Sequence, residues 1–203
     1  LYLPTEVSDL SKLPVNPPTG GWESLNANTA KKVSVPGTVE EYMTVSDWPQ
    51  PTDFSGVSWW FRTLDIPKDL KDATFILEFG AVRMRAEVYL DGQLVAYDIV
   101  GETPFEANVT KAIRPGEKQL LAVRVTNPGG NFHWQDFDVM NWGKYLIPPG
   151  RGFGGILGDV NLKALNPVYI SDIYMQNTPQ KTKVNAIISI RNLTDRKLKQ
   201  NIN

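Results

Sequence analysis

One short stretch brings together the side chains of this sequence that are best suited to chemistry. His133, Asp136 and Asp138 lie close together and are interleaved with aromatic residues, Trp134 among them. Three interpretations stay open. The stretch is a turn whose carboxylates bond backbone amides, a cation site with oxygen ligands, or a sugar site. In a sugar site, carboxylates accept hydrogen bonds from hydroxyls and an aromatic ring stacks on the apolar face of a pyranose.

Other catalytic constellations find little support. The sequence has no Cys, which excludes a thiolate nucleophile, a disulfide framework and a Cys-based metal site. His133 is the only His, and no Ser lies in a G-x-S-x-G pattern, so local packing is the favoured role of this imidazole. Asp136 and Asp138 are not evidence for a glycosidase pair, because any acidic protein supplies such pairs by chance. We expect neither a metal nor a cofactor.

Residues 150–155 match G-x-G-x-x-G but do not predict a nucleotide site. A dinucleotide fingerprint needs a strand before the glycines and a helix after them, so that phosphate meets the helix N-terminus. Here Pro148 and Pro149 precede the motif and a strand pattern follows it. The favoured interpretation is a loop whose glycines permit close approach of the backbone.

Composition excludes several classes of protein. The chain has 203 residues, of which 41% are hydrophobic and 21% charged, as in soluble globular proteins. The net charge of −1 predicts no attraction to nucleic acid or anionic lipid. No apolar run approaches the ~20 residues of a membrane span. No signal peptide is visible, although a bacterial periplasmic or extracellular location is favoured.

The elements that must position these residues are mostly short strands. Residues 84–90 alternate apolar and polar side chains and predict a half-buried strand. Asp91-Gly92 predicts a two-residue hairpin, and Thr38 with Glu41 predicts a capped short helix. The predicted strands are residues 57–66, 73–79, 84–90, 93–99, 121–125, 156–165, 168–176 and 184–190.

Closely spaced strands with little helix between them predict an all-β antiparallel sandwich. We expect a first domain over residues 1–166 and a boundary near Asn166-Pro167. Residues 167–203 are too few for an immunoglobulin-like domain of about 100 residues, so the second domain is expected to be incomplete. Its two strands are expected to pair with each other. They should then pack on the first domain or on another copy of the chain.

Several segments, in a fixed order, carry a resemblance to a known family. They resemble the patterns V-P-G, G-x-x-W-Y-R-R-x-F-x-V-P, L-x-F-x-G-V, A-x-V-Y-x-N-G, P-F-E, L-A-V-x-V and G-I-x-R-x-V-x-L at residues 35–37, 56–67, 77–82, 86–92, 104–106, 121–125 and 155–162, with Gly158 in place of the Arg of the last pattern. This series resembles the N-terminal sugar-binding domain of glycoside hydrolase family 2, which includes β-galactosidases, β-glucuronidases and β-mannosidases.

The resemblance implies a jelly-roll β-sandwich of the galactose-binding-like fold, followed by the first strands of an immunoglobulin-like domain. It also implies a parent enzyme that cleaves β-linked sugars with retention, with its catalytic glutamates on a TIM barrel. Such a barrel takes about 250 residues, which this chain cannot hold. The chain is therefore expected to be inactive alone, with carbohydrate, the barrel of the same protein and a further copy of the chain as partners.

The resemblance also implies a role for the loop that precedes residues 155–162. In several family members this loop helps to shape the sugar pocket. The corresponding substrate-binding residues would be Asp136, Asp138, Trp134 and His133, with Trp142 and Tyr145 as stacking platforms. Two rival interpretations remain: a free-standing carbohydrate-binding module that stacks sugar on these aromatic rings, and a purely structural β-domain.

Overall fold

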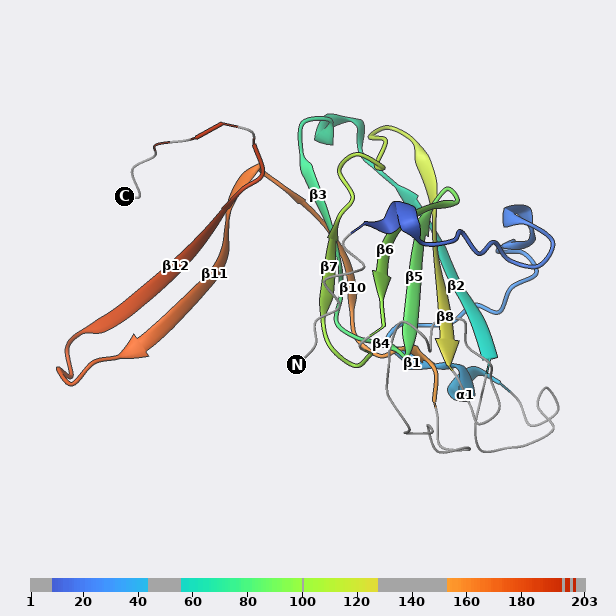
Figure 1. The fold of residues 1–203 in the computed structure, drawn as a ribbon, viewed down its shortest axis with the longest axis horizontal. Coiled ribbons are helices and arrows are strands. Elements are labelled where there is room, and N and C mark those ends of the chain that lie inside the picture. Colours follow the sequence, from blue (N-terminus) through green and yellow to red (C-terminus); the bar gives the residue numbers. More distant parts are fainter. Residues whose placement is uncertain are drawn as a thin grey trace.

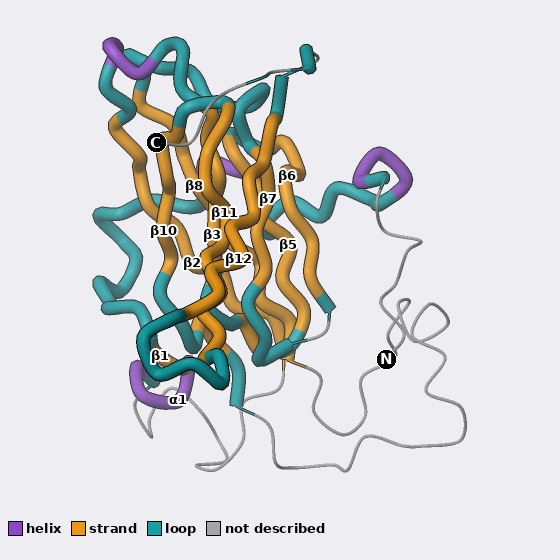
Figure 2. The backbone as a smooth tube through the Cα atoms, turned by 90° about the vertical axis from the view of Figure 1, so that its left-hand side faces the viewer, coloured by secondary structure: helices purple, strands orange, loops and turns teal. Residues whose placement is uncertain are grey.

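Strands dominate the chain because short β-branched and aromatic runs are separated by turns of Gly, Pro and Asp. The computed structural model describes residues 9–43, 56–99, 101–127, 153–194, 196, 197 and 199. Within them, two antiparallel sheets face each other, and a third, short sheet lies at one end of the sandwich (Figures 1 and 2).

The described strands of the sandwich fall into three sheets that are each antiparallel throughout. In spatial order, the first sheet is β2 (Gly56–Asp65), β8 (Lys118–Asn127), β5 (Arg85–Leu90) and β6 (Gln93–Asp98). The facing sheet is β10 (Val160–Leu165), β3 (Thr74–Phe79) and β7 (Phe105–Asn108). The short sheet is β1 (Gly37–Thr38), β9 (Gly155–Ile156) and β4 (Val82–Arg83). The helical turns are α1 (Val39–Tyr42), η2 (Leu10–Lys12), η3 (Trp22–Ser24) and η4 (Lys68–Leu70).

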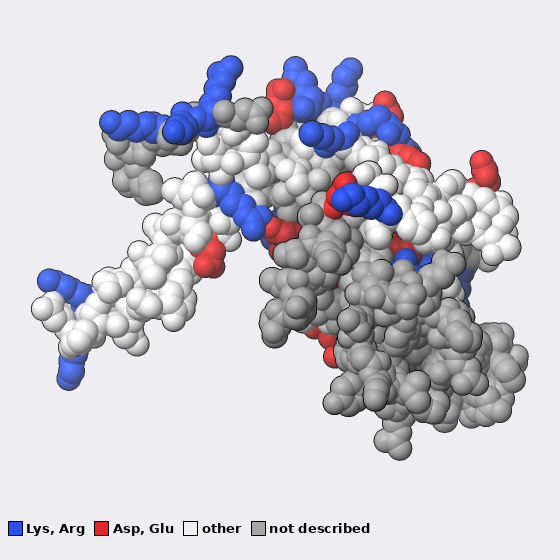
Figure 3. Space-filling model, viewed as in Figure 1, with Lys and Arg blue, Asp and Glu red and all other residues white. Residues whose placement is uncertain are grey.

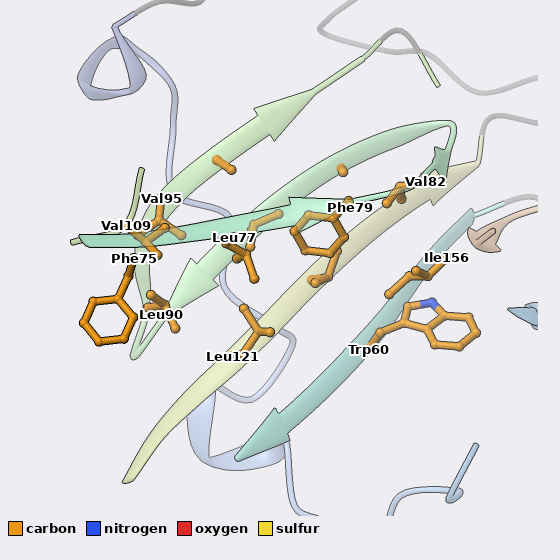
Figure 4. Close-up of a cluster of buried hydrophobic side chains, with 14 of the residues drawn as sticks. Trp60, Phe75, Leu77, Phe79, Val82, Leu90, Val95, Val109, Leu121 and Ile156 are labelled. Carbon is orange, nitrogen blue, oxygen red and sulfur yellow. The ribbon is translucent and has the colours of Figure 1, made fainter. Parts of the chain in front are cut away.

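The hydrophobic core lies between the two large sheets (Figure 4). Phe79 of β3 is fully buried and stacks on Phe105 of β7, with the ring centroids 4.9 Å apart. Trp60 of β2 and Leu121 of β8 belong to the same core cluster and come from the other sheet. Ile156 of the short sheet belongs to the same cluster, so the third sheet closes one end of the core.

The structure confirms the local predictions that rest on turn and cap chemistry. Asp91 and Gly92 adopt φ of 47° and 82° between β5 and β6, as a two-residue hairpin requires. Thr38 caps α1: its side chain accepts from the Glu41 backbone N–H, and the Glu41 carboxylate accepts from the Thr38 N–H at 2.9 Å. The all-β sandwich is confirmed as well.

Strand β5 corrects the prediction of a half-buried strand, because all six of its residues are buried. The alternation of residue types is real, but the polar face is not solvated. Asn16 and Trp22, more than 60 residues earlier in the chain, contact Glu87 and Tyr89 on that face. A segment distant in sequence therefore covers the side that the local pattern assigns to water.

The predicted strand over residues 156–165 is in fact two strands, β9 and β10, in different sheets. Between them Gly158 lies so close to the neighbouring chain that an added Cβ would be 2.6 Å from the Ala81 nitrogen. The N–H groups of Leu157 and Gly158 both donate to the Ala81 carbonyl oxygen. This contact turns the chain from one sheet to the other. Strand β7 was not among the predicted strands.

The last two strands, β11 (Val168–Asn177) and β12 (Val184–Asn192), form a separate antiparallel hairpin, which confirms that they pair with each other. The hairpin projects away from the sandwich (Figure 1). Its register places Ile173 opposite Ile188 and Met175 opposite Ala186 on one face, which is strongly apolar.

The apolar face of the hairpin is exposed in the single chain. Ile173 retains 54% of its accessible surface and Ile188 retains 40%. The face that carries Ile173 and Ile188 is therefore not packed on the first domain, although Arg191 at the base of the hairpin contacts Glu106 of the sandwich; packing of this face on another copy stays a prediction. In Figure 3 most of the hairpin surface is uncharged, with Lys181 and Lys183 in its turn.

Candidate functional site

The residues that the sequence selects for binding lie outside the described residues. They are His133, Trp134, Asp136, Asp138, Trp142 and Tyr145. The structure does describe the residues on either side of this stretch, up to Asn127 and from Phe153 onward. The candidate site is therefore described through its framework, the residues that hold Asn127 and Phe153 in place.

Asn127 and Gly154 bring the two sides of the stretch together. Asn127 is the last residue of β8 and is 1% exposed. A Cβ atom added to Gly154 would lie 2.8 Å from the Asn127 Cβ, so a larger residue at 154 would collide with it. The chain thus leaves the sandwich after β8 and re-enters it at the same place.

The short sheet β1–β9–β4 fixes this point of return. Ile156 of β9 pairs with Gly37 of β1 on one side and with Val82 of β4 on the other. The Val39 N–H donates to the Gly154 carbonyl oxygen at 2.8 Å and ties the start of α1 to the same segment. The returning chain is therefore held by hydrogen bonds on both edges and by the first turn of α1.

The described residues that flank stretch 44–55 lie at the same end of the sandwich as those that flank stretch 128–152. Before this gap lies α1, whose Tyr42 ring packs 6.0 Å from the Trp60 ring and donates its hydroxyl to the Ser34 carbonyl oxygen at 2.7 Å. After the gap comes Gly56, which pairs directly with Asn127 in the β2–β8 ladder. Figure 1 shows β1, β4 and α1 grouped at this end.

Arg83 is the charged group that marks this end among the described residues. Its guanidinium forms an ion pair with Glu102 and lies 4.3 Å from the centroid of the Phe153 ring. A cation over an aromatic face is attracted to it, so Arg83 helps to position the returning chain. Sequence reasoning missed this contact, because no local signal links residues 83 and 153.

A buried ion cluster lies on the outer face of the four-stranded sheet. Glu87 is 1% exposed and forms ion pairs with Arg85 and with Arg124, the latter at 2.9 Å. It also accepts hydrogen bonds from the Tyr89 hydroxyl at 2.5 Å and from Asn16 Nδ2 at 3.0 Å. The single buried carboxylate is thus compensated by two guanidinium groups inside the fold, and the cluster is structural.

The same cluster perturbs Tyr89. Burial, together with the neighbouring Glu87 carboxylate, raises the pKa of the Tyr89 hydroxyl above its usual value. The phenol therefore stays protonated, and its O–H group donates a hydrogen bond to the Glu87 carboxylate. Tyr89 serves as a hydrogen-bond donor at neutral pH and is not a candidate base.

The described part of the chain offers no further cofactor chemistry. No group of three or more His, Cys, Asp or Glu side chains is placed there to hold a metal ion. Residues 133–138 lie outside this part, so the cation interpretation, which was one of three alternatives, is not tested there, and neither is the expectation that no metal binds. No helix of the described residues is long and apolar enough to span a bilayer.

Comparison with known families decides what kind of domain carries this framework. The model of the sugar binding domain of glycosyl hydrolases family 2 matches residues 10–162. The chain belongs to this family. The resemblance seen in the sequence is thereby confirmed, and the sandwich with its short closing sheet is the family 2 sugar-binding domain.

Relatives in this family carry glycosidase names. A β-glucuronidase of Formosa agariphila is 27% identical over 157 residues, which cover 73% of this chain and 16% of that protein. A β-galactosidase of Thermoanaerobacter pseudethanolicus is 24% identical over 207 residues, covering 98% of this chain and 25% of that protein. The chain therefore spans a quarter or less of the length of these relatives.

Solved structures of family 2 enzymes share the fold. The Faecalibacterium prausnitzii β-glucuronidase superposes with a TM-score of 0.59 at 25% identity, covering 80% of this chain and 31% of that one. An uncultured Clostridium β-glucuronidase gives a TM-score of 0.60 at 25% identity. This family 2 domain thus has the architecture found in larger enzymes.

Proposed function

We propose that this family 2 domain is the non-catalytic part of a retaining β-glycosidase, in which it supports a catalytic barrel and lines the edge of the sugar pocket. The proposed substrate class is a β-linked terminal sugar, in keeping with relatives that are named β-glucuronidase and β-galactosidase. The partners are carbohydrate and the remaining domains of the same enzyme.

The observation that supports this proposal is the convergence of two chain segments at one end of the sandwich. Gly56 and Asn127 are paired neighbours, and Gly154 packs against Asn127. The residues that flank segment 128–152 and the residue that follows segment 44–55 are thus neighbours on one scaffold, and binding residues are often carried by loops on such scaffolds.

Within segment 128–152, we assign sugar contacts to the polar and aromatic residues that the sequence selects. Asp136 and Asp138 would accept hydrogen bonds from hydroxyls, beside Trp134 and His133. Trp142 and Tyr145 would stack against pyranose faces. These assignments rest on side-chain chemistry and on the fixed positions of Asn127 and Phe153.

The test compares the 203-residue chain with the full-length enzyme that contains it. We expect the chain alone to leave aryl β-glucuronides and β-galactosides intact, because the barrel carries the catalytic pair. In the full-length enzyme, Asp136→Asn and Asp138→Asn should raise KM more than they lower kcat. Lys111→Gln, an exposed substitution on the sandwich, is the matched control and should leave both constants unchanged.

Calorimetry separates this proposal from the rival binding module. If the chain alone bound a sugar at millimolar or tighter affinity, and Trp134→Ala abolished that binding, the domain would be a carbohydrate-binding module in its own right. If the aspartate variants left KM unchanged, the pocket role of residues 128–152 would be wrong and a purely structural domain would remain.

We further propose that residues 1–166 form one domain and that residues 167–203 begin a second, immunoglobulin-like domain. The bare apolar face of β11 and β12 supports this, because a sandwich requires an opposing sheet. Hydrogen exchange tests it. The β12 amides should be strongly protected in the full-length enzyme and weakly protected in the chain alone. Equal exchange in both would contradict the proposal.

A further inference from the structure

The outer face of the β10–β3–β7 sheet carries an unusual pair of like charges. Glu78 of β3 and Glu106 of β7 lie directly opposite each other in the ladder. Like charges in such a cross-strand pair destabilise a sheet unless each is neutralised. The residue that neutralises each carboxylate therefore shows which part of the molecule this face needs for its stability.

The two carboxylates take their counterions from different parts of the molecule. Glu78 pairs with Lys163 of β10, a strand of its own sheet, at 2.7 Å. Glu106 pairs with Arg191, which belongs to β12 in the projecting hairpin. Arg191 lies opposite Tyr169 in the hairpin, and hydrogen bonds from it to Glu106 and Tyr169 raise the pKa of its guanidinium. One of the two like charges is thus balanced from outside the sandwich.

The base of the hairpin is tied to the sandwich in two further ways. Only two residues, Asn166 and Pro167, separate β10 from β11, and the proline ring restricts the backbone there. The Leu193 N–H, just after β12, donates to the Pro167 carbonyl oxygen at 2.9 Å. Both strands of the hairpin are therefore fastened at the linker, and the Arg191 contact adds a side-chain attachment.

A groove of about 190 Å³ lies where these attachments meet. Ile76 and Glu106 of the sandwich and Tyr169, Ile170 and Arg191 of the hairpin are among the residues that line it. Ile76 is only 4% exposed although it lies outside the main core cluster. The sandwich and the base of the hairpin therefore form an interface with an apolar part and a charged part.

We propose that the outer face of the β10–β3–β7 sheet is a docking surface for the hairpin, and that the Glu106–Arg191 pair is the electrostatic latch that sets the hairpin's angle. The latch acts on the hairpin itself and is independent of any glycosidase activity. Any domain that continues from β12 would inherit this angle relative to the sandwich.

Spin labels can measure the angle directly, because the sequence has no Cys to compete with introduced ones. Thr63→Cys on β2 and Asn185→Cys on β12 are both exposed strand positions. Electron–electron double resonance on the full chain, labelled at both positions, should give one narrow distribution of the distance between the two labels. Arg191→Glu or Glu106→Arg should reduce the population at that distance about two- to fivefold, the range expected for an exposed ion pair.

The exchange variant, E106R with R191E, restores opposite charges and should recover the original distribution. Lys183→Glu in the hairpin turn makes the same charge change as Arg191→Glu away from the interface, and should change nothing. Raising the salt concentration should move the parent chain toward the single variants. Glu106→Gln provides a neutral variant if a charge reversal prevents folding.

Three results would overturn the latch. They are a broad distribution in the parent chain, single variants that match the parent, and an exchange variant that fails to recover its distribution. Urea unfolding followed by tryptophan fluorescence serves as the folding control. Each variant should unfold cooperatively, and its free energy of unfolding should fall by less than about 1 kcal/mol, as expected for exposed charges outside the core.

Discussion

Gly155 and Gly37 approach so closely that a Cβ atom added to residue 155 would lie 2.3 Å from the Gly37 carbonyl oxygen. The contact is between backbones, so no flexible side chain can move aside to relieve it. It lies in the β1–β9 pair that fixes the point at which the chain returns to the sandwich. Packing thus explains Gly155, the last glycine of the literal G-x-G-x-x-G motif, whereas Gly150 and Gly152 lie outside the described residues.

Gly155→Ala should destabilise the domain by about 1–3 kcal/mol, the usual cost of forcing extra atoms into a packed site. Chemical denaturation measures the loss. Gly20→Ala is the matched control, because residue 20 has a φ of +89° but its nearest neighbour is Ser24 Cβ at 3.5 Å. A smaller loss at 155 than at 20 would mean that the backbones can separate without cost.

Glu87→Ala should be among the most damaging polar substitutions in the sandwich. It removes a carboxylate that is 1% exposed and leaves the guanidinium groups of Arg85 and Arg124 without that partner. Breaking a buried pair from one side costs about 3–5 kcal/mol. The free energy of unfolding in urea checks this value.

The control for Glu87 is an exposed acidic residue whose arginine partner keeps a second carboxylate, Asp91. Glu117 pairs with Arg114, and the two side chains are 58% and 50% exposed. Removing such a partner should cost less than about 1 kcal/mol. Equal losses at residues 87 and 117 would show that the buried cluster contributes no more than a surface pair.

Trp22→Ala should loosen the segment that covers the polar face of β5. The Trp22 ring lies 4.9 Å from the Tyr89 ring and 5.7 Å from the Trp59 ring. We expect a loss of about 2 kcal/mol, less than for a fully buried Trp, because Trp22 is partly exposed. Val15→Ala, at a position 52% exposed, should change stability by less than about 0.5 kcal/mol. Hydrogen exchange checks that the cover is loosened. The amide of Tyr89, which lies beneath Trp22, should exchange faster in Trp22→Ala than in the parent chain, and at the parent rate in Val15→Ala.

Asp91 should make the stability of the domain depend on acid pH. Burial raises the pKa of this carboxyl, but hydrogen bonds from the Leu120 N–H, Gln119 and Arg114 outweigh it and hold the pKa below its usual value. A depressed folded-state pKa contributes stability above the unfolded-state value, and that stability is lost as pH falls through the folded-state value.

Asp91→Asn should therefore cost more stability at pH 6 than at pH 2.5, because the stability that the parent carboxylate contributes is lost progressively as the pH falls. Urea unfolding at several pH values between these limits provides the test. A difference between parent and variant that stayed constant with pH would refute the linkage.

The sequence predicts those parts of the fold whose causes are local. The capping box at Thr38 and the turn at Asp91-Gly92 need only neighbouring residues, and both form as predicted. The full burial of β5 could not be predicted, because the cover comes from Asn16, 71 positions before Glu87. Likewise, the split between β9 and β10 depends on Gly158 meeting Ala81 across the fold.

The candidate site likewise has a part that the sequence predicts and a part that depends on long-range contacts. Residue chemistry and family resemblance select Asp136 and Asp138, which stay predictions. The framework around them, with Arg83 over Phe153 and Gly154 against Asn127, depends on contacts that no local pattern encodes. The sequence therefore suggests the binding groups, while the described structure supplies the positions from which they extend.

The contact between Gly154 and Asn127 also bears on how such a domain can diversify. The ends of segment 128–152 are held together by the sandwich itself, so the free energy of closing a segment there grows only with the logarithm of its length. Each doubling adds about 0.6 kcal/mol. Insertions and deletions between these anchors are thus nearly neutral for folding. The segment can therefore be replaced, in evolution or by engineering, to change which ligand the domain binds while the strands stay unchanged.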